Sequence, residues 1–226
     1  MLFDLALKEF SDLGAGFKIA ALDLELRGAG NMLGGEQSGH IEAIGFELYT
    51  QMLERAVREM KGEAAPDEAE TQLNLGLNIR IPADYVPEEN QRLQMYKRVA
   101  RVETESQLTD VAAEMQDRYG PPPHAVRNLL NYASLKLLCM KVGVNAIERK
   151  RDSVTLKFQQ NAAVDPEQLA RFVSAQRGAQ FTPDGMLKFV LKATAAEEVL
   201  RALRTVLEQL ASAETASEVR SASGQV

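Results

Sequence analysis

The sequence predicts an α+β protein in which an N-terminal helical hairpin with a glycine-rich loop precedes a mixed α/β domain with short strands. Eight of the fifteen glycines lie within the first forty-five residues, between two segments of helical length. Beyond residue 70, apolar residues first alternate as in a strand and then follow helical spacing between turn residues. We therefore expect a hairpin over residues 1–62, an acidic linker over 63–70, a domain over 71–211 and a disordered tail over 212–226.

The first segment of the hairpin, residues 17–26, has two interpretations. Its leucines alternate at positions 22 to 26 as in a strand, whereas its apolar residues as a whole also follow helical spacing. Because glycines frame a segment of helical length, we favour a helix. The returning helix, residues 46–61, has one clear apolar stripe. Neither helix can bury its apolar side without a partner.

The domain is expected to begin with a strand. Residues 62–70 (GEAAPDEAE) are acidic and lack apolar periodicity, which is typical of a linker. Apolar residues then alternate without a break from Leu73 to Ile81, which predicts a half-buried strand that Pro82 ends.

Three helices are predicted next, over residues 88–102, 104–119 and 124–142. In the first, Leu93, Tyr96, Val99 and Ala100 are expected to face inward, and Arg92, Lys97, Arg98 and Arg101 outward. The second begins with the capping-box spacing of Thr104 and Gln107. Glycines follow both the second and the third helix, where chains commonly turn.

The C-terminal part of the domain is expected to contain a β-hairpin, two helices and one further strand. The hairpin comprises residues 144–147 and 154–158 around a charged turn, ERKRDS. Asp165 and Pro166 are a good N-cap and first-turn pair for the first helix, which is expected to end near Gly178.

The end of the domain follows the same logic. A turn at residues 183–185 precedes a short strand over residues 187–191. Thr194 with Glu197 is expected to cap a last helix that runs to about residue 211.

The composition is that of a soluble globular protein, 45% apolar and 26% charged. No apolar run approaches the roughly 20 residues of a bilayer crossing, and the first ten residues lack the basic region of a signal peptide. The single Cys139 suits a reducing compartment, so we expect a cytoplasmic location. The net charge of −6 repels nucleic acid, so any DNA contact has to be local or supplied by another part of a larger protein.

Common catalytic and cofactor motifs are absent from the sequence. The glycines from Gly28 to Gly34 do not have dinucleotide-binding spacing, and no Gly-Lys pair forms a phosphate loop. Two distant histidines and one cysteine do not make a familiar zinc site, and His124, beside prolines, is expected to be a surface residue. An autonomous enzyme is therefore not expected.

The glycine-rich loop carries two side chains able to act together. Arg27 has a guanidinium that can grip carboxylate or phosphate, and Gln37 offers both a donor and an acceptor. The alternative is that Arg27 caps the carbonyl groups at a helix end. Spacing alone does not favour either interpretation.

The motifs of this loop resemble the translocation motif shared by the bacterial transcription-repair coupling factors and the branch-migrating helicase RecG. The matching segments are DLGAGF (12–17), DLELRGAG (23–30), LGGEQSG (33–39) and IGFELY (44–49). Three more segments, IRIPADYVP, RLQMYKR (92–98) and DRYGPPP (117–123), are similar to the C-terminal domain of the coupling factors. The resemblance extends to about residue 210.

The resemblance implies that the hairpin couples ATP hydrolysis to stepping along double-stranded DNA, beside the second lobe of a motor. The motif places the coupling arginine at Arg27 and the coupling glutamine at Gln37, with Gly28, Gly30 and Gly39 in the same loop. ATP and Mg²⁺ would bind the motor lobes, whose motifs this sequence does not contain, so the chain alone is expected to have no cofactor, no metal and no ATPase activity.

The resemblance also implies that the C-terminal domain is regulatory. In the family it packs against the N-terminal module, which resembles the repair helicase UvrB, and hides the UvrA-binding surface until the motor engages stalled RNA polymerase. Glu114 and Asp117 match acidic positions of that interface. Without the family, a solvated helix face is the simpler interpretation of the pair.

The sequence is thus interpreted as a C-terminal fragment of a coupling factor, with Phe3 where the family has an arginine. A second hypothesis is a free-standing protein-binding module that uses the regulatory domain without motor activity. A third is a small DNA-binding protein that uses the basic turn at residues 149–151, against which the acidic total argues.

Overall fold

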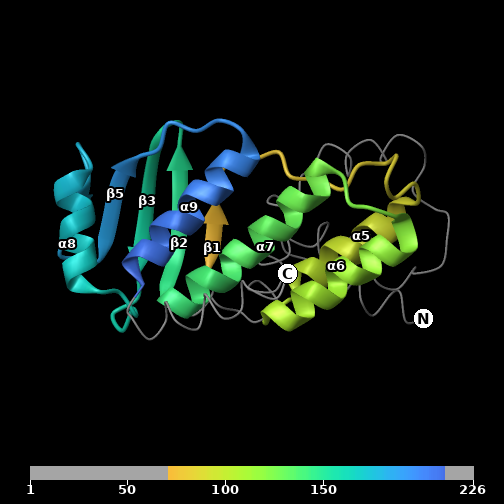
Figure 1. Ribbon diagram of the computed structural model, residues 1–226, viewed down its shortest axis with the longest axis horizontal. Helices are drawn as coiled ribbons and strands as arrows, with labels where there is room; N and C mark the ends of the chain where they lie inside the picture. The colour runs from red at the N-terminus through yellow and green to blue at the C-terminus, as the bar shows by residue number, and fades with distance from the viewer. Residues whose placement is uncertain (1–70, 212–226) are drawn as a thin grey trace, which may run out of the picture.

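The computed structural model describes residues 71–211, which form a five-stranded sheet at one end and a group of helices at the other (Figure 1). The helices are α5 (Glu89–Ala100), α6 (Glu105–Tyr119), α7 (His124–Val142), α8 (Pro166–Ala175) and α9 (Ala196–Leu210). The strands are β1 (Gln72–Asn74), β2 (Val144–Lys150), β3 (Ser153–Phe158), β4 (Gln180–Phe181) and β5 (Met186–Val190). This arrangement confirms a mixed α/β domain with short strands. The hairpin, the linker and the tail predicted from the sequence lie outside the described residues.

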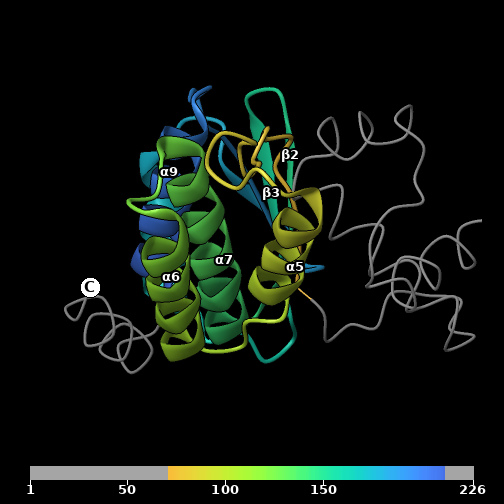
Figure 2. The ribbon, with the colours of Figure 1, turned by 90° about the vertical axis from the view of Figure 1, so that its right-hand side faces the viewer.

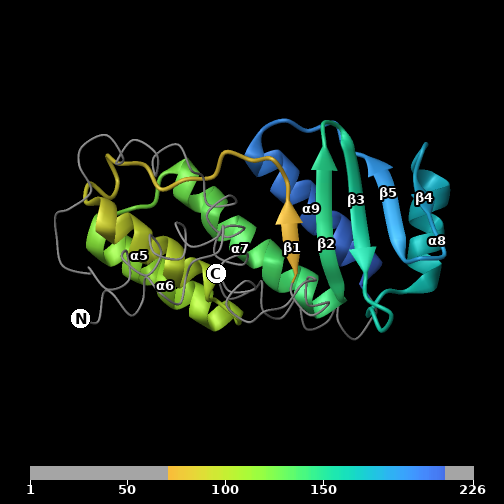
Figure 3. The same cartoon turned by 180° about the vertical axis from the view of Figure 1, so that it is seen from behind.

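The sheet has the strand order β1-β2-β3-β5-β4, with β1 parallel to β2 and all other neighbours antiparallel. Paired residues share a face, and the face formed by Leu73, Ile147, Leu156 and Leu187 is almost completely buried. Helices α7, α8 and α9 lie on this face (Figures 1 and 3). No described helix covers the opposite face, which follows the one-sided pattern common in antiparallel sheets.

The strand predicted over residues 73–81 is shorter than expected, because β1 comprises only three residues. Gly76 has a φ of +65°, a left-handed conformation that suits glycine, and there the chain leaves the sheet. The alternation of buried and exposed residues nevertheless continues from Leu73 to Ile81. Hydrophobic periodicity therefore identified the buried side chains correctly but overstated the length of the hydrogen-bonded strand.

Helix α5 departs from the sequence prediction in which residues it buries. Arg92, expected outside, is buried, as is Met95, whereas Leu93 is only half-buried. In Figure 2, α5 lies to one side of α6 and α7, and it also contacts residues of the preceding segment, Ile81, Val86 and Pro87. The buried side of α5 is thus set by the segment that precedes it, which the periodicity of the helix alone does not reveal.

Helices α6 and α7 match their predictions closely. The Thr104 side chain accepts a hydrogen bond from the Gln107 backbone N–H at 3.2 Å, as the capping box requires. The Gln107 side chain returns to the N–H of Glu103, one residue before the expected partner. Gly143 follows α7 in the left-handed conformation with a φ of +81°.

The C-terminal half contains two corrections and one addition. In the hairpin, β2 continues to Lys150 and β3 begins at Ser153, so the turn between them comprises two residues and not six. Helix α9 begins after Ala195 without a side-chain cap, so the cap predicted at Thr194 is wrong. The additional strand β4 is too short to leave a periodic signal. The Asp165 cap of α8 is confirmed.

Candidate functional site

The three segments that are similar to the C-terminal domain of the coupling factors, residues 79–87, 92–98 and 117–123, contact one another in the helical group, in a region here called the corner. The backbone N–H of Ile81 donates a hydrogen bond to the Tyr96 hydroxyl on α5 at 2.6 Å. The buried Arg92 donates from Nη1 to the carbonyl oxygens of Val86 and Pro87, both at 2.8 Å. Because charge-assisted bonds to backbone are strong when shielded from water, Arg92 fixes this loop on α5.

Two tyrosines close the corner against the end of α6. The single hydrogen of the Tyr85 hydroxyl is shared between the carbonyl oxygens of Met115 and Gly120, which lie 3.0 and 2.9 Å from the hydroxyl oxygen. The Tyr85 and Tyr119 rings lie 5.8 Å apart between centroids, and the Tyr119 hydroxyl donates to Gln91 Oε1 at 2.9 Å. Burial, and secondarily the neighbouring Tyr119, raise the pKa of Tyr85 above its ordinary value. The motif tyrosines are therefore used to hold the last turn of α6.

Glu114 lies on the outer side of this corner and is bound within the domain. Its carboxylate forms ion pairs with Arg98 of α5 and with Arg118 one turn further along α6, the latter at 3.0 Å. The Arg118 guanidinium also lies over the Tyr119 ring, 5.0 Å from its centroid. Glu114 thus joins α5 to α6, and its charge is balanced by two arginines. The sequence spacing offered a signal for Arg118 but none for Arg98.

Asp117 lies one turn from Glu114 on the same helix but is used differently. Its side chain is exposed, and within residues 71–211 it has neither an ion pair nor a side-chain hydrogen bond. Nothing in the packing of α6 requires this carboxylate. Asp117 is therefore available to a group outside the described domain.

The other residues singled out from the sequence have structural roles or lie outside the described part. Arg149, which the sequence assigned to the basic turn, lies in β2 and donates to the carbonyl oxygens of Leu75 and Ala193, at 3.3 and 2.6 Å, so its guanidinium is held within the domain. The His124 side chain is exposed, and its Nδ1 lies 3.8 Å from Oε2 of Glu197. Burial raises the pKa of the Cys139 thiol far above its ordinary value, so it is not a reactive thiolate. Arg27, Gln37, Gly28, Gly30 and Gly39 lie outside the described residues.

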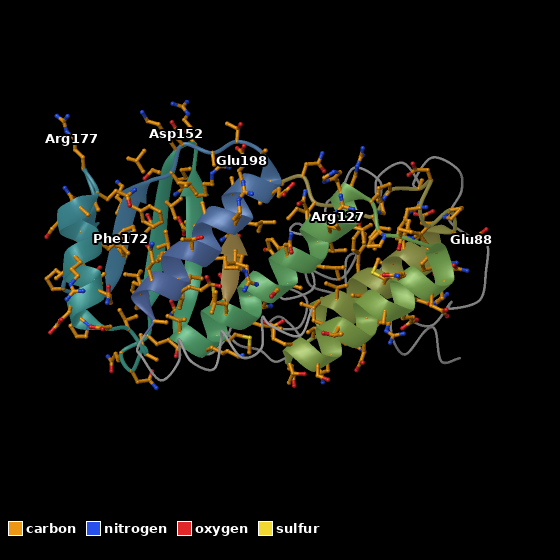
Figure 4. All side chains as sticks on the ribbon, in the orientation of Figure 1. Glu88, Arg127, Asp152, Phe172, Arg177 and Glu198 are labelled. Atoms are coloured by element: carbon orange, nitrogen blue, oxygen red, sulfur yellow. The ribbon has the colours of Figure 1, made fainter. Side chains whose placement is uncertain are left out.

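The described domain shows no sign of a metal centre or a membrane span. Between residues 71 and 211, no three His, Cys, Asp or Glu residues are grouped closely enough to hold a metal ion. None of the helices in that range is both long and apolar enough to cross a bilayer. The exposed side chains of the helical group include the apolar Met140 of α7 and the charged Glu88 and Arg127, which are labelled in Figure 4.

Comparison with known proteins identifies relatives of this domain. Residues 75–169 match the TRCF domain family, which covers the corner, α5, α6 and α7. The chain is 43% identical over 162 residues to a transcription-repair-coupling factor of Staphylococcus epidermidis, a match that covers 71% of this chain and 14% of that protein. It is 38% identical over 176 residues to the transcription-repair-coupling factor of Escherichia coli, a match that covers 76% of this chain and 15% of that protein. It is 36% identical over 208 residues to the transcription-repair-coupling factor of Myxococcus xanthus, a match that covers 90% of this chain and 17% of that protein.

The fold has a counterpart among solved structures. A crystal structure of the C-terminal domain of a transcription-repair coupling factor superposes with a TM-score of 0.53 at 22% identity, covering 62% of this chain and 91% of that domain. The matched region of the curated relatives amounts to about one seventh of their length.

Proposed function

Because residues 75–169 carry a TRCF domain and the chain is homologous to transcription-repair-coupling factors over about 70% of its length, we propose that it acts as the C-terminal regulatory part of such a factor. The parent activity would be ATP-dependent translocation on double-stranded DNA, which displaces stalled RNA polymerase and recruits excision repair. In this proposal the regulatory domain docks on the UvrB-like N-terminal module of the same protein and masks its UvrA-binding surface.

The observation that carries the proposal is the exposed Asp117 on a rigidly held helix end. Arg92 holds the loop before α5, Tyr85 of that loop hydrogen-bonds the carbonyl groups at the end of α6, and Tyr119 of α6 donates to Gln91 of α5. A charged group held in place loses little conformational entropy on docking, so it contributes more to an interface than a mobile one. Glu114 would contribute to the interface by holding Arg98 and Arg118 in place as well as by its charge.

Residues 1–62 would supply the translocation hairpin, with Arg27 and Gln37 transmitting movement of the motor lobe. Support for this part comes from the resemblance of the sequence motifs alone. Gly28, Gly30 and Gly39 would allow the loop to bring the two side chains together.

The regulatory proposal is tested by reversing the charge of Asp117. We expect Asp117→Lys in the full chain to weaken binding to the N-terminal module of a coupling factor by about tenfold, because a buried charge pair would be replaced by repulsion. Binding is measured by isothermal titration calorimetry.

The matched control is Asp184→Lys in the turn before β5, an exposed aspartate at the opposite end of the domain. It changes the net charge equally and should leave binding unchanged. If both variants bind as tightly as the parent chain, the docking face is not on α6, and the regulatory contact has to be sought elsewhere.

A further inference from the structure

The face of the sheet opposite the helices, here called the open face, carries an unusual set of side chains. The register places Gln72, Asn74, Ala146, Glu148, Lys150, Ser153, Thr155, Lys157, Gln180, Met186, Lys188 and Val190 on this face. None of them is buried. Figure 3 shows the open face toward the viewer, without a described helix in front of it. Its charged residues are three lysines and one glutamate, in a chain whose net charge is −6.

Two of the lysines are free to bind another group. Lys150 pairs with Glu148 at 3.3 Å, which accounts for one positive and the only negative charge of the open face. Lys157 on β3 and Lys188 on β5 are exposed, and neither has an ion pair within the described domain. The Lys157 partner across the strands is Met186, two residues from Lys188, so the two ammonium groups are diagonal neighbours. They form a local positive site on an acidic protein.

The chain itself contains an acidic segment of suitable length next to this face. Residues 63–70 contain Glu63, Asp67, Glu68 and Glu70 and no basic residue. They immediately precede Thr71, whose side chain is fixed by a hydrogen bond to the Val144 carbonyl at 3.0 Å. The segment is thus tethered at the β1 edge of the sheet.

The distances allow these opposite charges to meet. Gln72, Ala146 and Lys157 lie in one row of the register, so Lys157 is two strand spacings, roughly 10 Å, from Gln72. Lys188 is one strand further and one row along, roughly 16 Å away. An extended chain covers about 3.3 Å per residue, so three to five residues span these distances. Glu70 lies two residues before Gln72, about 7 Å along an extended chain, and the long side chains of Glu70 and Lys157 cover the remainder. Asp67 and Glu68 lie five and four residues before Gln72 and can reach Lys188.

We propose that the acidic segment 63–70 of this chain binds the open face through Lys157 and Lys188. Each ion pair is weak at an exposed site. A segment tethered a few residues away, however, has an effective concentration in the millimolar range or above, so weak pairs suffice for substantial occupancy. The contact weakens as salt rises, because exposed charges are screened.

The test is the acetylation rate of individual lysines in the full chain, followed by mass spectrometry at low salt. A variant with Glu63→Gln, Asp67→Asn, Glu68→Gln and Glu70→Gln removes the acidic charges. We expect Lys157 and Lys188 to react about threefold faster in this variant than in the parent chain, which corresponds to two-thirds occupancy. Lys141 and Lys192, both exposed and off the open face, serve as references and should react equally in the two proteins.

Changing the salt and the protein concentration, and adding DNA, distinguishes the acidic segment from a second copy of the chain or nucleic acid as the group bound to the open face. At about 0.5 M salt the difference between the two proteins should vanish. Equal rates for Lys157 and Lys188 in both proteins at low salt overturn the proposal. Protection that grows with protein concentration indicates a second copy, and protection that appears only on addition of duplex DNA indicates nucleic acid; either result also overturns it.

Discussion

Helices α7 and α8 lie against the same face of the sheet, but they are buried to very different extents. Nine residues of α7 are buried: Val126, Leu129, Tyr132, Ala133, Leu135, Leu137, Leu138, Cys139 and Val142. None of the residues of α8 is buried, although Phe172 packs edge-on against Phe189 of β5 with the ring centroids 5.4 Å apart. Helix α7 runs between the sheet, α9 and α6, whereas α8 lies at the edge beside the two-residue strand β4 (Figure 1).

The comparison shows that the central helix and the edge helix depend on different sources of stability. Helix α7 has no side-chain cap at its first residue, and tertiary packing holds it. Helix α8 has an Asp165 cap to the N–H groups of Glu167 and Gln168, and a proline in its first turn. Local signals therefore specify the exposed helix, and apolar burial specifies the central one.

The largest difference is expected for the same leucine truncation in each helix. Leu135→Ala in α7 should lower the free energy of unfolding by about 3.5 kcal/mol, because it leaves a cavity around a side chain that is 0% exposed. Leu169→Ala in α8 should cost only about 1 kcal/mol, because Leu169 is half-buried and water can fill the space. Urea unfolding followed by circular dichroism measures both losses. Equal losses would show that α8 belongs to the central core.

A second matched pair concerns the glycines that follow the two helices. Gly143 and Gly178 have similar positive φ values, +81° and +85°. A Cβ on Gly143 would lie 2.7 Å from the Ala162 Cα, whereas one on Gly178 meets nothing within 4 Å. Gly143→Ala should therefore cost about 2.5 kcal/mol and Gly178→Ala about 1 kcal/mol, the latter for backbone strain alone.

The contact at Gly143 explains this expectation. The loop after β3 closes on the end of α7 through hydrogen bonds from Gln159 N–H to the Gly143 carbonyl and from Ala163 N–H to the Val142 carbonyl, at 2.8 and 2.9 Å. Since these bonds hold Ala162 in place, the backbone has little freedom to yield. Thermal unfolding measures the two losses, and a Gly143→Ala variant no less stable than Gly178→Ala would mean that the loop moves away at little cost.

Most elements with local signals were predicted correctly, although the cap at Thr194, which is also a local signal, was not. The helix limits at Gly120 and Gly143, the Thr104 cap and the Asp165 cap are all confirmed, because each depends on residues within one turn. The early end of β1 could not be predicted, because hydrogen bonding to a distant strand decides it. The burial of Arg92 depends likewise on the carbonyl groups of a separate loop.

In the candidate site, too, the sequence predicted the local features but not the tertiary contacts. The spacing of Glu114 and Asp117 placed both on one helix, as the structure has them. The bond of Glu114 to Arg98 joins two helices and has no signature in either. The sequence therefore located the acidic pair but not the difference between its members, which arises from tertiary contacts.

The smallest expected difference concerns two glutamates with the same local partner. Glu114 pairs with Arg118 and Glu167 pairs with Arg171, each four residues apart, but only Glu114 also binds an arginine of another helix. Glu114→Gln should lower the free energy of unfolding by about 0.5 kcal/mol, because its carboxylate is partly shielded and contacts two cations. Glu167→Gln should have no measurable effect, because both members of its pair are largely exposed.

The loss for Glu114→Gln should shrink at about 0.5 M salt, where exposed ion pairs are screened. Chemical unfolding at low and high salt measures both variants. If the two glutamates prove equivalent, Arg98 adds nothing to stability, and its pairing with Glu114 does not hold α5 against α6.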